Sequence, residues 1–260
     1  MTAEKLGITA CLALTDEFLR AIRVTRTKRE LYELMEAVTR EMGFRHFALI
    51  HHDDLTTDRS DRIDVKDYPA AIAERLIGQR RYRRDPVIRA CLFAGSAFLW
   101  SDLPSIIRLD RQDHHSIEFG AREGLNEGIT VPHFRLNDCP GSCTFAGAPC
   151  LLRARRYLGP AQMIGTFAFQ AARRLVRAAG APPAPPPRLH PRPRDCVVLA
   201  GRGYSNKQIA RELGLTPRTV DGYLTEARRL FESHDRTELL VSAVLAGEIG
   251  LHELSRGQPG

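Results

Sequence analysis

Apolar residues in the first two thirds of the chain follow two spacings, one typical of helices and one typical of strands. Residues 44–50 and 128–134 are short apolar runs, which indicates β-strands, and residues 143–147 suggest another. A long helix is predicted from about residue 159 to residue 179. Helices beside antiparallel strands predict an α+β sandwich with a central cavity. A further helix is indicated by apolar residues recurring every three or four positions, namely Leu31, Leu34, Met35 and Val38.

A proline-rich segment divides the chain into two parts. Seven of the thirteen residues from Ala181 to Pro193 are proline, and this composition favours an extended, semi-rigid spacer. We therefore predict a first domain at residues 10–180, a linker at residues 181–193 and an all-helical second domain at residues 189–252.

The segment 205–224 has the pattern of two short helices joined by a glycine turn. Ser205 and Gln208 form a capping box, in which each side chain bonds the other residue's backbone N–H, so a helix is predicted to begin here. Gly214 stands where a left-handed residue ends a helix, and a threonine then supplies an N-cap before Pro217. This spacing is typical of a DNA-binding helix-turn-helix.

The second of these helices has one buried face and one outward face. Val220, Leu224, Ala227 and Phe231 recur at intervals of four, three and four, which places them on one inward stripe. In a helix-turn-helix the N-terminal half of this helix enters the DNA major groove, although a packed helical hairpin without DNA would share the pattern. The residues predicted to contact bases or phosphates are Lys207, Thr216, Arg218, Thr219, Asp221, Thr225 and Arg228.

Composition and charge agree with a DNA-binding interpretation. The chain has 260 residues, of which 43% are hydrophobic and 27% charged, as is ordinary for a globular protein of one or two domains. The net charge is +7, and residues 188–230 contain nine Lys or Arg against four Asp or Glu, which suits a polyanionic partner. The N-terminal apolar run is too short for a signal peptide, and no run approaches a membrane span, so we expect a cytoplasmic protein.

Two clusters suggest other chemistry. Cys139, Cys143 and Cys150 lie within twelve residues and could bind a metal or form a redox pair. Their spacing matches no standard zinc pattern, however, and a loop of small residues explains them as well, so we predict no metal site and no cofactor. Residues 51–54 (HHDD) follow an apolar strand, and a solvated turn is expected there.

The segment around residues 68–86 has a regular apolar face. Tyr68, Ile72 and Leu76 recur every four residues on a predicted helix that opens at a proline, and this face needs a covering partner. Asp85 precedes another proline, which is typical of a turn or a helix cap. From the residues alone, core packing and a ligand site are both open for this segment.

Taken together, the two halves resemble LuxR-type quorum-sensing transcription factors, which join an autoinducer-binding domain to a four-helix DNA-binding domain. The resemblance covers nearly the whole chain. Residues 189–224 (LHPRPRDCVVLAGRGYSNKQIARELGLTPRTVDGYL) are similar to the family's DNA-binding pattern without a gap. The matching positions in the first half are Tyr68-Pro69, Asp85-Pro86-Val87, Phe98-Leu99-Trp100-Ser101, Gly128 and Thr144.

The resemblance implies an N-acyl-homoserine lactone as the ligand. Asp85 would accept the ligand's amide N–H, and Tyr68 would donate to its acyl carbonyl. Gly128 would be a structural glycine. An apolar cavity with a few such polar groups is what a fatty-acyl amide requires. The other residues that the resemblance places around the ligand are Ile72, Leu76, Val87, Trp100 and Thr144.

Four positions depart from the family's pattern. Ile72 stands where the family has a tryptophan whose indole N–H contacts the lactone carbonyl, and Leu76 replaces a common aromatic residue. Losing one buried donor would weaken lactone binding by roughly tenfold to a hundredfold. In the second half, Pro193 replaces a usual glutamate, and Gly222 lies inside the recognition helix, where glycine costs about 1 kcal/mol relative to alanine.

We therefore expect a ligand-responsive transcriptional regulator that binds an inverted-repeat site as a homodimer, with RNA polymerase as a further partner. The last helix, predicted at about residues 237–249, would either form a dimer contact or pack within the core of the domain. An orphan regulator that responds to another small molecule or to none, and an antagonist that pairs with another regulator, are the alternatives. An enzyme is not expected, since the chain has no recognisable catalytic elbow or Gly-rich phosphate loop.

Overall fold

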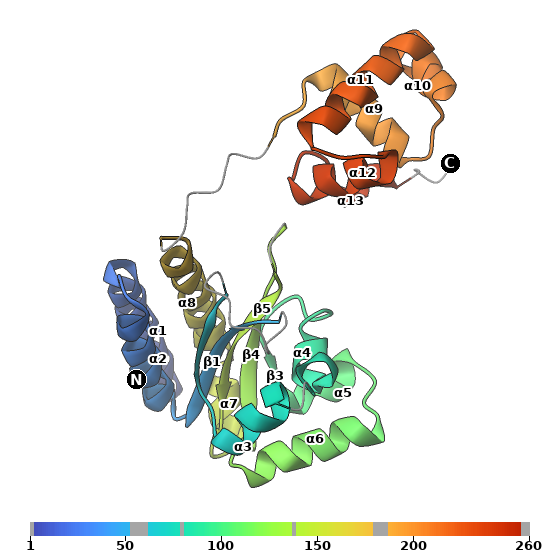
Figure 1. The fold of residues 1–260 in the computed structure, drawn as a ribbon. Coiled ribbons are helices and arrows are strands. Elements are labelled where there is room, and N and C mark those ends of the chain that lie inside the picture. The colour runs from blue at the N-terminus through green and yellow to red at the C-terminus, as the bar shows by residue number, and fades with distance from the viewer. Residues whose placement is uncertain (1–2, 53–61, 79–80, 137–138, 179–186, 256–260) are drawn as a thin grey trace. The chain divides into compact units, whose positions relative to one another are not determined.

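The computed structural model describes residues 3–52, 62–78, 81–136, 139–178 and 187–255. The chain divides into two compact units, the first formed by residues 1–135 and 139–182 and the second by residues 136–138 and 183–260 (Figure 1). Each unit has its own hydrophobic core. Much of the predicted linker lies outside the described residues.

A five-stranded antiparallel sheet forms the centre of the first unit, in the order β2-β1-β5-β4-β3. Every residue of β5 is buried, because neighbouring strands flank it and helices cover both of its faces. The predicted α+β fold with an antiparallel sheet is thus confirmed. The strands are β1 (His46–His51), β2 (Asp64–Asp67), β3 (Phe98–Leu99), β4 (Gly128–His133) and β5 (Gly141–Ala146).

Helices α2 (Lys28–Met42) and α8 (Leu158–Ala178) cover one face of the sheet, and the long helix α1 (Ala3–Val24) packs against both of them (Figure 1). The main core lies between these helices and the sheet, and it includes the fully buried Phe145 and Phe169. Helix α8 matches the long helix predicted from the sequence, whereas α1 begins before the expected start of the domain. The short helix α7 (Leu151–Arg156) leads into α8.

Shorter helices lie on the other side of the sheet (Figure 1). Two small apolar clusters form there, one of which packs Ile72 and Leu125 against Ala146 of β5. These elements connect β2 to β4 and surround the cavity described below. They are α3 (Ala70–Ala73), the π-helix η1 (Glu74–Gly78), the 3-10 helix η2 (Arg81–Arg84), α4 (Pro86–Ala90), the 3-10 helix η3 (Trp100–Asp102), α5 (Leu103–Ile106) and α6 (Arg111–Arg122).

The second unit is helical throughout its described elements. Its helix-turn-helix follows the predicted caps: Ser205 and Gln208 form the capping box, and Gly214 ends the first helix with φ +65°. Val220, Leu224 and Ala227 are buried, as their spacing predicted. The helices are α9 (Pro191–Gly201), α10 (Asn206–Leu213), α11 (Pro217–Leu230), α12 (Arg236–Leu245) and the single turn α13 (Leu251–Leu254).

Two structural details predicted for this unit were wrong, although α9 begins inside the domain predicted at residues 189–252. Helix α9 begins at Pro191, so the last part of the predicted extended linker is helical and Pro193 is buried. Prolines fit there because the first-turn N–H groups of a helix have no partner within the helix. Helix α12 ends at Leu245 rather than near residue 249, since Gly247 adopts φ +75° and Ile249 turns into the core.

Within the described residues, no helix combines the length and the apolar character that crossing a membrane requires.

Candidate ligand-binding and DNA-binding sites

A cavity of about 310 Å³ lies between the sheet and the short helices of the first unit. The sheet forms the floor of the cavity, where Ser142 and Thr144 of β5 and Ile50 of β1 face it. Because successive side chains of a strand point to opposite faces, Cys143 and Phe145 join the main core on the other side. The structure brings all seven predicted ligand-binding residues to this cavity. They are Tyr68, Ile72, Leu76, Asp85, Val87, Trp100 and Thr144.

Asp85 uses one side chain both to cap helix α4 and to line the cavity. Its Oδ1 accepts hydrogen bonds from the backbone N–H groups of Val87 at 3.0 Å and Ile88 at 3.1 Å. Burial raises the pKa of this carboxyl to about 6, and the two backbone hydrogen bonds oppose the rise because they favour the ionised form. The turn or cap predicted before Pro86 is therefore a helix N-cap.

The hydroxyl of Tyr68 belongs to a polar chain along the cavity floor. Burial and the nearby Asp85 raise the pKa of the phenol, while a hydrogen bond with Thr144 opposes the rise. The hydroxyl stays protonated at neutral pH and can donate. Thr144 Oγ1 lies 3.0 Å from Thr130 Oγ1, which accepts the indole N–H of Trp100, also at 3.0 Å.

Ile72 and Leu76 lie on consecutive turns of different kinds. A continuous α-helix was predicted for this segment, but α3 ends at Ala73 and the chain continues as the π-helix η1. Both side chains still line the cavity. The chain between them is not a continuous α-helix, because a π turn is wider than an α turn. Ile72 is 6% exposed and packs on Leu125, so this part of the wall is apolar.

Trp100 packs against the first residue of strand β4. A Cβ atom on Gly128 would lie 2.7 Å from Trp100 Cε2 and 2.9 Å from the carbonyl oxygen of Phe145. Such contacts would displace either the indole or the neighbouring strand. A glycine at this position therefore keeps the indole within reach of the cavity and of Thr130.

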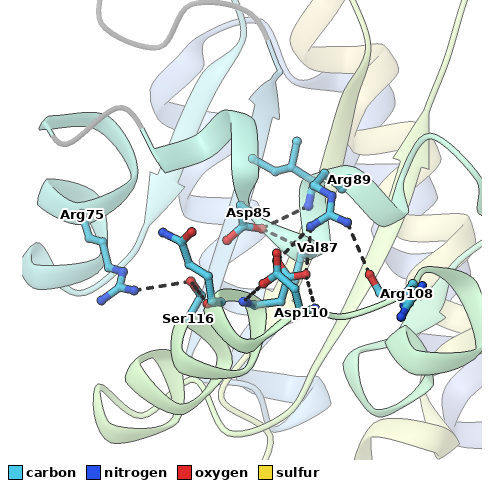
Figure 2. Close-up of polar contacts among 10 residues, drawn as sticks. Arg75, Asp85, Val87, Arg89, Arg108, Asp110 and Ser116 are labelled. Carbon is cyan, nitrogen blue, oxygen red and sulfur yellow. Dashed lines mark hydrogen bonds and ion pairs between the residues drawn. The ribbon is translucent and has the colours of Figure 1, made fainter.

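A charged cluster joins helices α4 and α6 (Figure 2). Arg89 Nη1 donates to both carboxylate oxygens of Asp113 at 2.9 Å, and the Asp113 side chain is 4% exposed. Asp113 also accepts from the backbone N–H of Asp110 at 3.0 Å, while Asp110 caps α6 by accepting from the N–H of Asp113. Because α6 forms one wall of the cavity, this cluster positions that wall.

Several cavity residues were not predicted from the sequence. Arg75 of η1 and Ser116 and Phe119 of α6 all line the cavity. Arg75 Nη2 lies 3.4 Å from Ser116 Oγ, and its guanidinium carbon lies 4.4 Å from the centre of the Phe119 ring. The amphipathic pattern of residues 111–122 was a usable signal for the helix, but not for its place in the fold.

The solvated turn expected at residues 51–54 was wrong for its first half. Strand β1 continues through His51, which pairs with Gly141 of β5 and is 6% exposed. His52 Nε2 lies 2.9 Å from Ser142 Oγ, and burial lowers the pKa of this imidazole to about 4. Strand pairing therefore extends beyond the apolar run. Asp53 and Asp54 lie outside the described residues.

The three clustered cysteines occupy different environments. Cys143 is buried in β5, where burial raises the pKa of its thiol, and Cys150 is exposed just before α7. Cys139 is partly buried. Across the part of the chain that the structure describes, no group of three or more His, Cys, Asp or Glu side chains is placed to hold a metal ion.

The predicted DNA-contacting residues lie on or beside the outward side of the helix-turn-helix. Helix α11 begins with Thr216 as its N-cap, whose Oγ1 accepts from the N–H of Thr219 at 3.1 Å. Asp221 accepts from Asn206 Nδ2 at 3.3 Å, which connects the two helices of the motif. The predicted residues are all exposed or half-buried: Lys207, Thr216, Arg218, Thr219, Asp221, Thr225 and Arg228.

Known protein families match both units. Residues 27–172 match the Autoinducer binding domain family, and residues 188–243 match the family described as bacterial regulatory proteins, luxR family. The chain is also similar to the transcriptional activator protein BjaR1 of Bradyrhizobium diazoefficiens. The two are 25% identical over 230 residues, which are 88% of this chain and 93% of BjaR1.

Solved structures share the fold. A structure of SdiA in complex with octanoyl-rac-glycerol is 18% identical with a TM-score of 0.57, over 90% of this chain and 93% of that one. SdiA is a protein of Escherichia coli. CepR2 from Burkholderia cenocepacia, an N-acylhomoserine lactone dependent LuxR family transcription factor, is 16% identical with a TM-score of 0.51. That match covers 66% of this chain and 99% of the CepR2 chain.

Proposed function

Because the chain belongs to the LuxR family of bacterial transcriptional regulators with an autoinducer binding domain, we propose that it senses an N-acyl-homoserine lactone. In this proposal the ligand occupies the cavity of the first unit. The second unit then binds an inverted-repeat DNA site as part of a homodimer in the cytoplasm. Family membership makes the chain a DNA-binding regulator and not an enzyme.

The juxtaposition of Asp85 and Tyr68 in a mostly apolar cavity carries the ligand proposal. Asp85 Oδ1 is engaged by two backbone N–H groups, so we assign the ligand's amide N–H to Oδ2. A charge-assisted hydrogen bond of this kind is stronger than a neutral one. The protonated Tyr68 hydroxyl donates to the acyl carbonyl beside that amide.

The remaining walls suit the acyl chain. Leu76, Val87 and Leu103 supply apolar surface from three different elements, and Leu125 closes another side. Burying a methylene group contributes about 0.8 kcal/mol, so the affinity for each acyl chain length depends on how many of its carbons the cavity buries. The likeness to CepR2, which is an N-acylhomoserine lactone dependent factor, supports this class of ligand.

The DNA-binding proposal rests on helix α11. Its capped N-terminus presents Arg218, Thr219 and Asp221 away from the core formed by Val220 and Leu224. In a helix-turn-helix such residues reach base edges, while Lys207 and Arg228 are suited to phosphates. Two such helices in a dimer would be spaced by about one turn of DNA, which predicts an inverted repeat.

The test is thermal unfolding of the full chain against a panel of N-acyl-homoserine lactones of different chain length. Ligand that binds the folded state raises the unfolding temperature. We expect a shift for at least one chain length, and a much smaller shift for Asp85→Ala. An equal shift in wild type and Asp85→Ala would reject the assigned amide contact.

An orphan regulator that responds to a different small molecule is the second candidate. Ile72 favours it, because this buried side chain offers no hydrogen-bond donor to a lactone carbonyl. The absence of a shift across the whole lactone panel, with the protein folded, would favour this candidate over the first.

A further inference from the structure

Arg75 brings a positive charge to a cavity whose walls are largely apolar. The residue belongs to η1, on the turn after Ile72, and its side chain is half-buried. In Figure 2 it reaches toward Ser116 of α6, to which Nη2 is 3.4 Å away. Arg84 also lines the cavity, but its side chain is exposed.

Phe119 and Ser116 help to orient the guanidinium group of Arg75. It lies over the ring of Phe119, with 4.4 Å from the guanidinium carbon to the ring centre, and Ser116 accepts at its edge. Arginine carries five N–H donors in a rigid planar fork. A stacked and edge-bonded guanidinium is therefore compatible with donation to an oxygen atom in the cavity.

Two other residues of the cavity wall have no N–H left to offer a head group. The single indole N–H of Trp100 donates to Thr130, and Ile72 has no polar atom. Tyr68 lies beside Asp85 and Thr144, at the position assigned to the ligand's amide group. Of the two arginines in the described cavity wall, Arg75 is the less exposed, so a ligand with an oxygen acceptor beyond its amide meets it as a charged donor that water screens less.

We propose that Arg75 binds an oxygen acceptor on the ligand's head group and so determines head-group specificity. This inference rests on the proposed function, because it takes an acylated amide as the occupant of the cavity. The acceptor is either the ring carbonyl of a lactone or the carboxylate of the ring-opened acid. Both present an oxygen to the fork, and the carboxylate can accept two parallel bonds.

The experiment compares three ligands that share one acyl chain: the N-acyl-homoserine lactone, the ring-opened N-acyl-homoserine and an N-acyl cyclopentylamide. The cyclopentylamide keeps the amide but has no head-group acceptor. Titrations of the full chain follow the fluorescence of Trp100, the one tryptophan of the sequence. Arg75→Met preserves side-chain length and apolar contact with Phe119, and its thermal unfolding verifies that it folds.

We expect wild type to prefer the lactone or the acid over the cyclopentylamide by about tenfold or more, and Arg75→Met to lose that preference. Arg75→Lys should retain part of it, because the charge remains without the fork. A stronger preference for the acid identifies a carboxylate head group, and a preference for the lactone identifies the ring carbonyl.

Two outcomes would overturn the assignment, and they are distinguishable. An unchanged preference and affinity in Arg75→Met would show that Arg75 does not bind the head group. An equal loss of affinity for all three ligands would show that Arg75 acts through the shape of the cavity or through Asp85. The proposed function would survive either result. Failure of all three ligands to bind wild type at any chain length would remove the proposed function and this assignment with it.

Discussion

Asp85 carries two tasks that substitution can separate. Asparagine keeps an oxygen able to cap α4, whereas alanine removes it, so we expect Asp85→Ala to lose about 1 kcal/mol of stability and Asp85→Asn much less. Both should weaken ligand binding, by roughly tenfold to a hundredfold for the alanine variant. Thermal unfolding without ligand and Trp100 fluorescence with ligand measure the two effects. Wild-type affinity in Asp85→Ala would contradict the assigned contact.

The raised pKa of Asp85 predicts a pH dependence of ligand binding. Its value of about 6 means that the carboxylate is ionised above that pH and protonated below it. Only the ionised form is a charge-assisted acceptor for an amide N–H, so affinity should fall as the pH is lowered from 7 to 5. Titrations across this range should show the fall in wild type and a nearly flat profile in Asp85→Asn. A flat wild-type profile would place the ligand elsewhere.

At the scale of elements, the Arg89–Asp113 pair holds α4 against α6. Replacing Asp113 leaves the half-buried guanidinium of Arg89, whose side chain is 35% exposed, without its carboxylate partner, so Asp113→Leu should lower the free energy of unfolding by about 1–3 kcal/mol. The double variant Arg89→Met with Asp113→Leu should lose less, because no charge is left behind. Urea unfolding of the full chain measures both. A double variant less stable than Asp113→Leu would argue against this role of the pair.

The recognition helix gives a second prediction at this scale. Thr219→Ala and Asp221→Ala should each reduce binding to a selected operator by about five- to a hundredfold, with little change in the unfolding temperature. Gly222→Ala serves as the control, since a Cβ there meets open space and alanine favours a helix by about 1 kcal/mol. Fluorescence anisotropy measures binding to the operator duplex and, for comparison, to a duplex of scrambled sequence. Unchanged operator affinity in both alanine variants would reject their recognition role.

Periodicity and capping chemistry predicted the elements of both units well. Ser205, Gly214 and Thr216 placed the helix-turn-helix accurately because caps are local interactions between residues a few positions apart. The continuous helix expected at Ile72 was wrong because a π turn depends on what it packs against. The solvated turn expected at His51 was wrong because a partner strand ninety residues away extends the pairing.

The candidate cavity was predictable by resemblance but not by pattern. All seven residues that the resemblance suggested line one cavity, while their contact with a ligand stays a prediction. Arg75 and Ser116 escaped prediction because they meet only through the packing of η1 against α6, forty-one residues apart. Arg89 and Asp113 were missed for the same reason. Side-chain pairs between distant elements leave no periodic signal in the sequence.

At the scale of the whole molecule, ligand control of DNA binding requires that the two units be thermodynamically coupled. If ligand binding to the first unit changes the DNA affinity of the second, DNA binding must change the ligand affinity by the same factor. Such couplings typically amount to about 5–150-fold. If the ligand strengthens DNA binding, operator DNA should therefore lower the dissociation constant of the ligand, measured by Trp100 fluorescence. If the ligand weakens DNA binding, operator DNA should raise that constant.

The most direct test of ligand control is the operator affinity of the full chain with and without a saturating lactone, the ligand's presence being verified by Trp100 fluorescence. Anisotropy of a labelled inverted-repeat duplex gives the two dissociation constants. We predict that they differ by at least about fivefold, and that Asp85→Ala at the same lactone concentration shows no difference. Identical constants for wild type, with the lactone bound, would contradict ligand control of DNA binding.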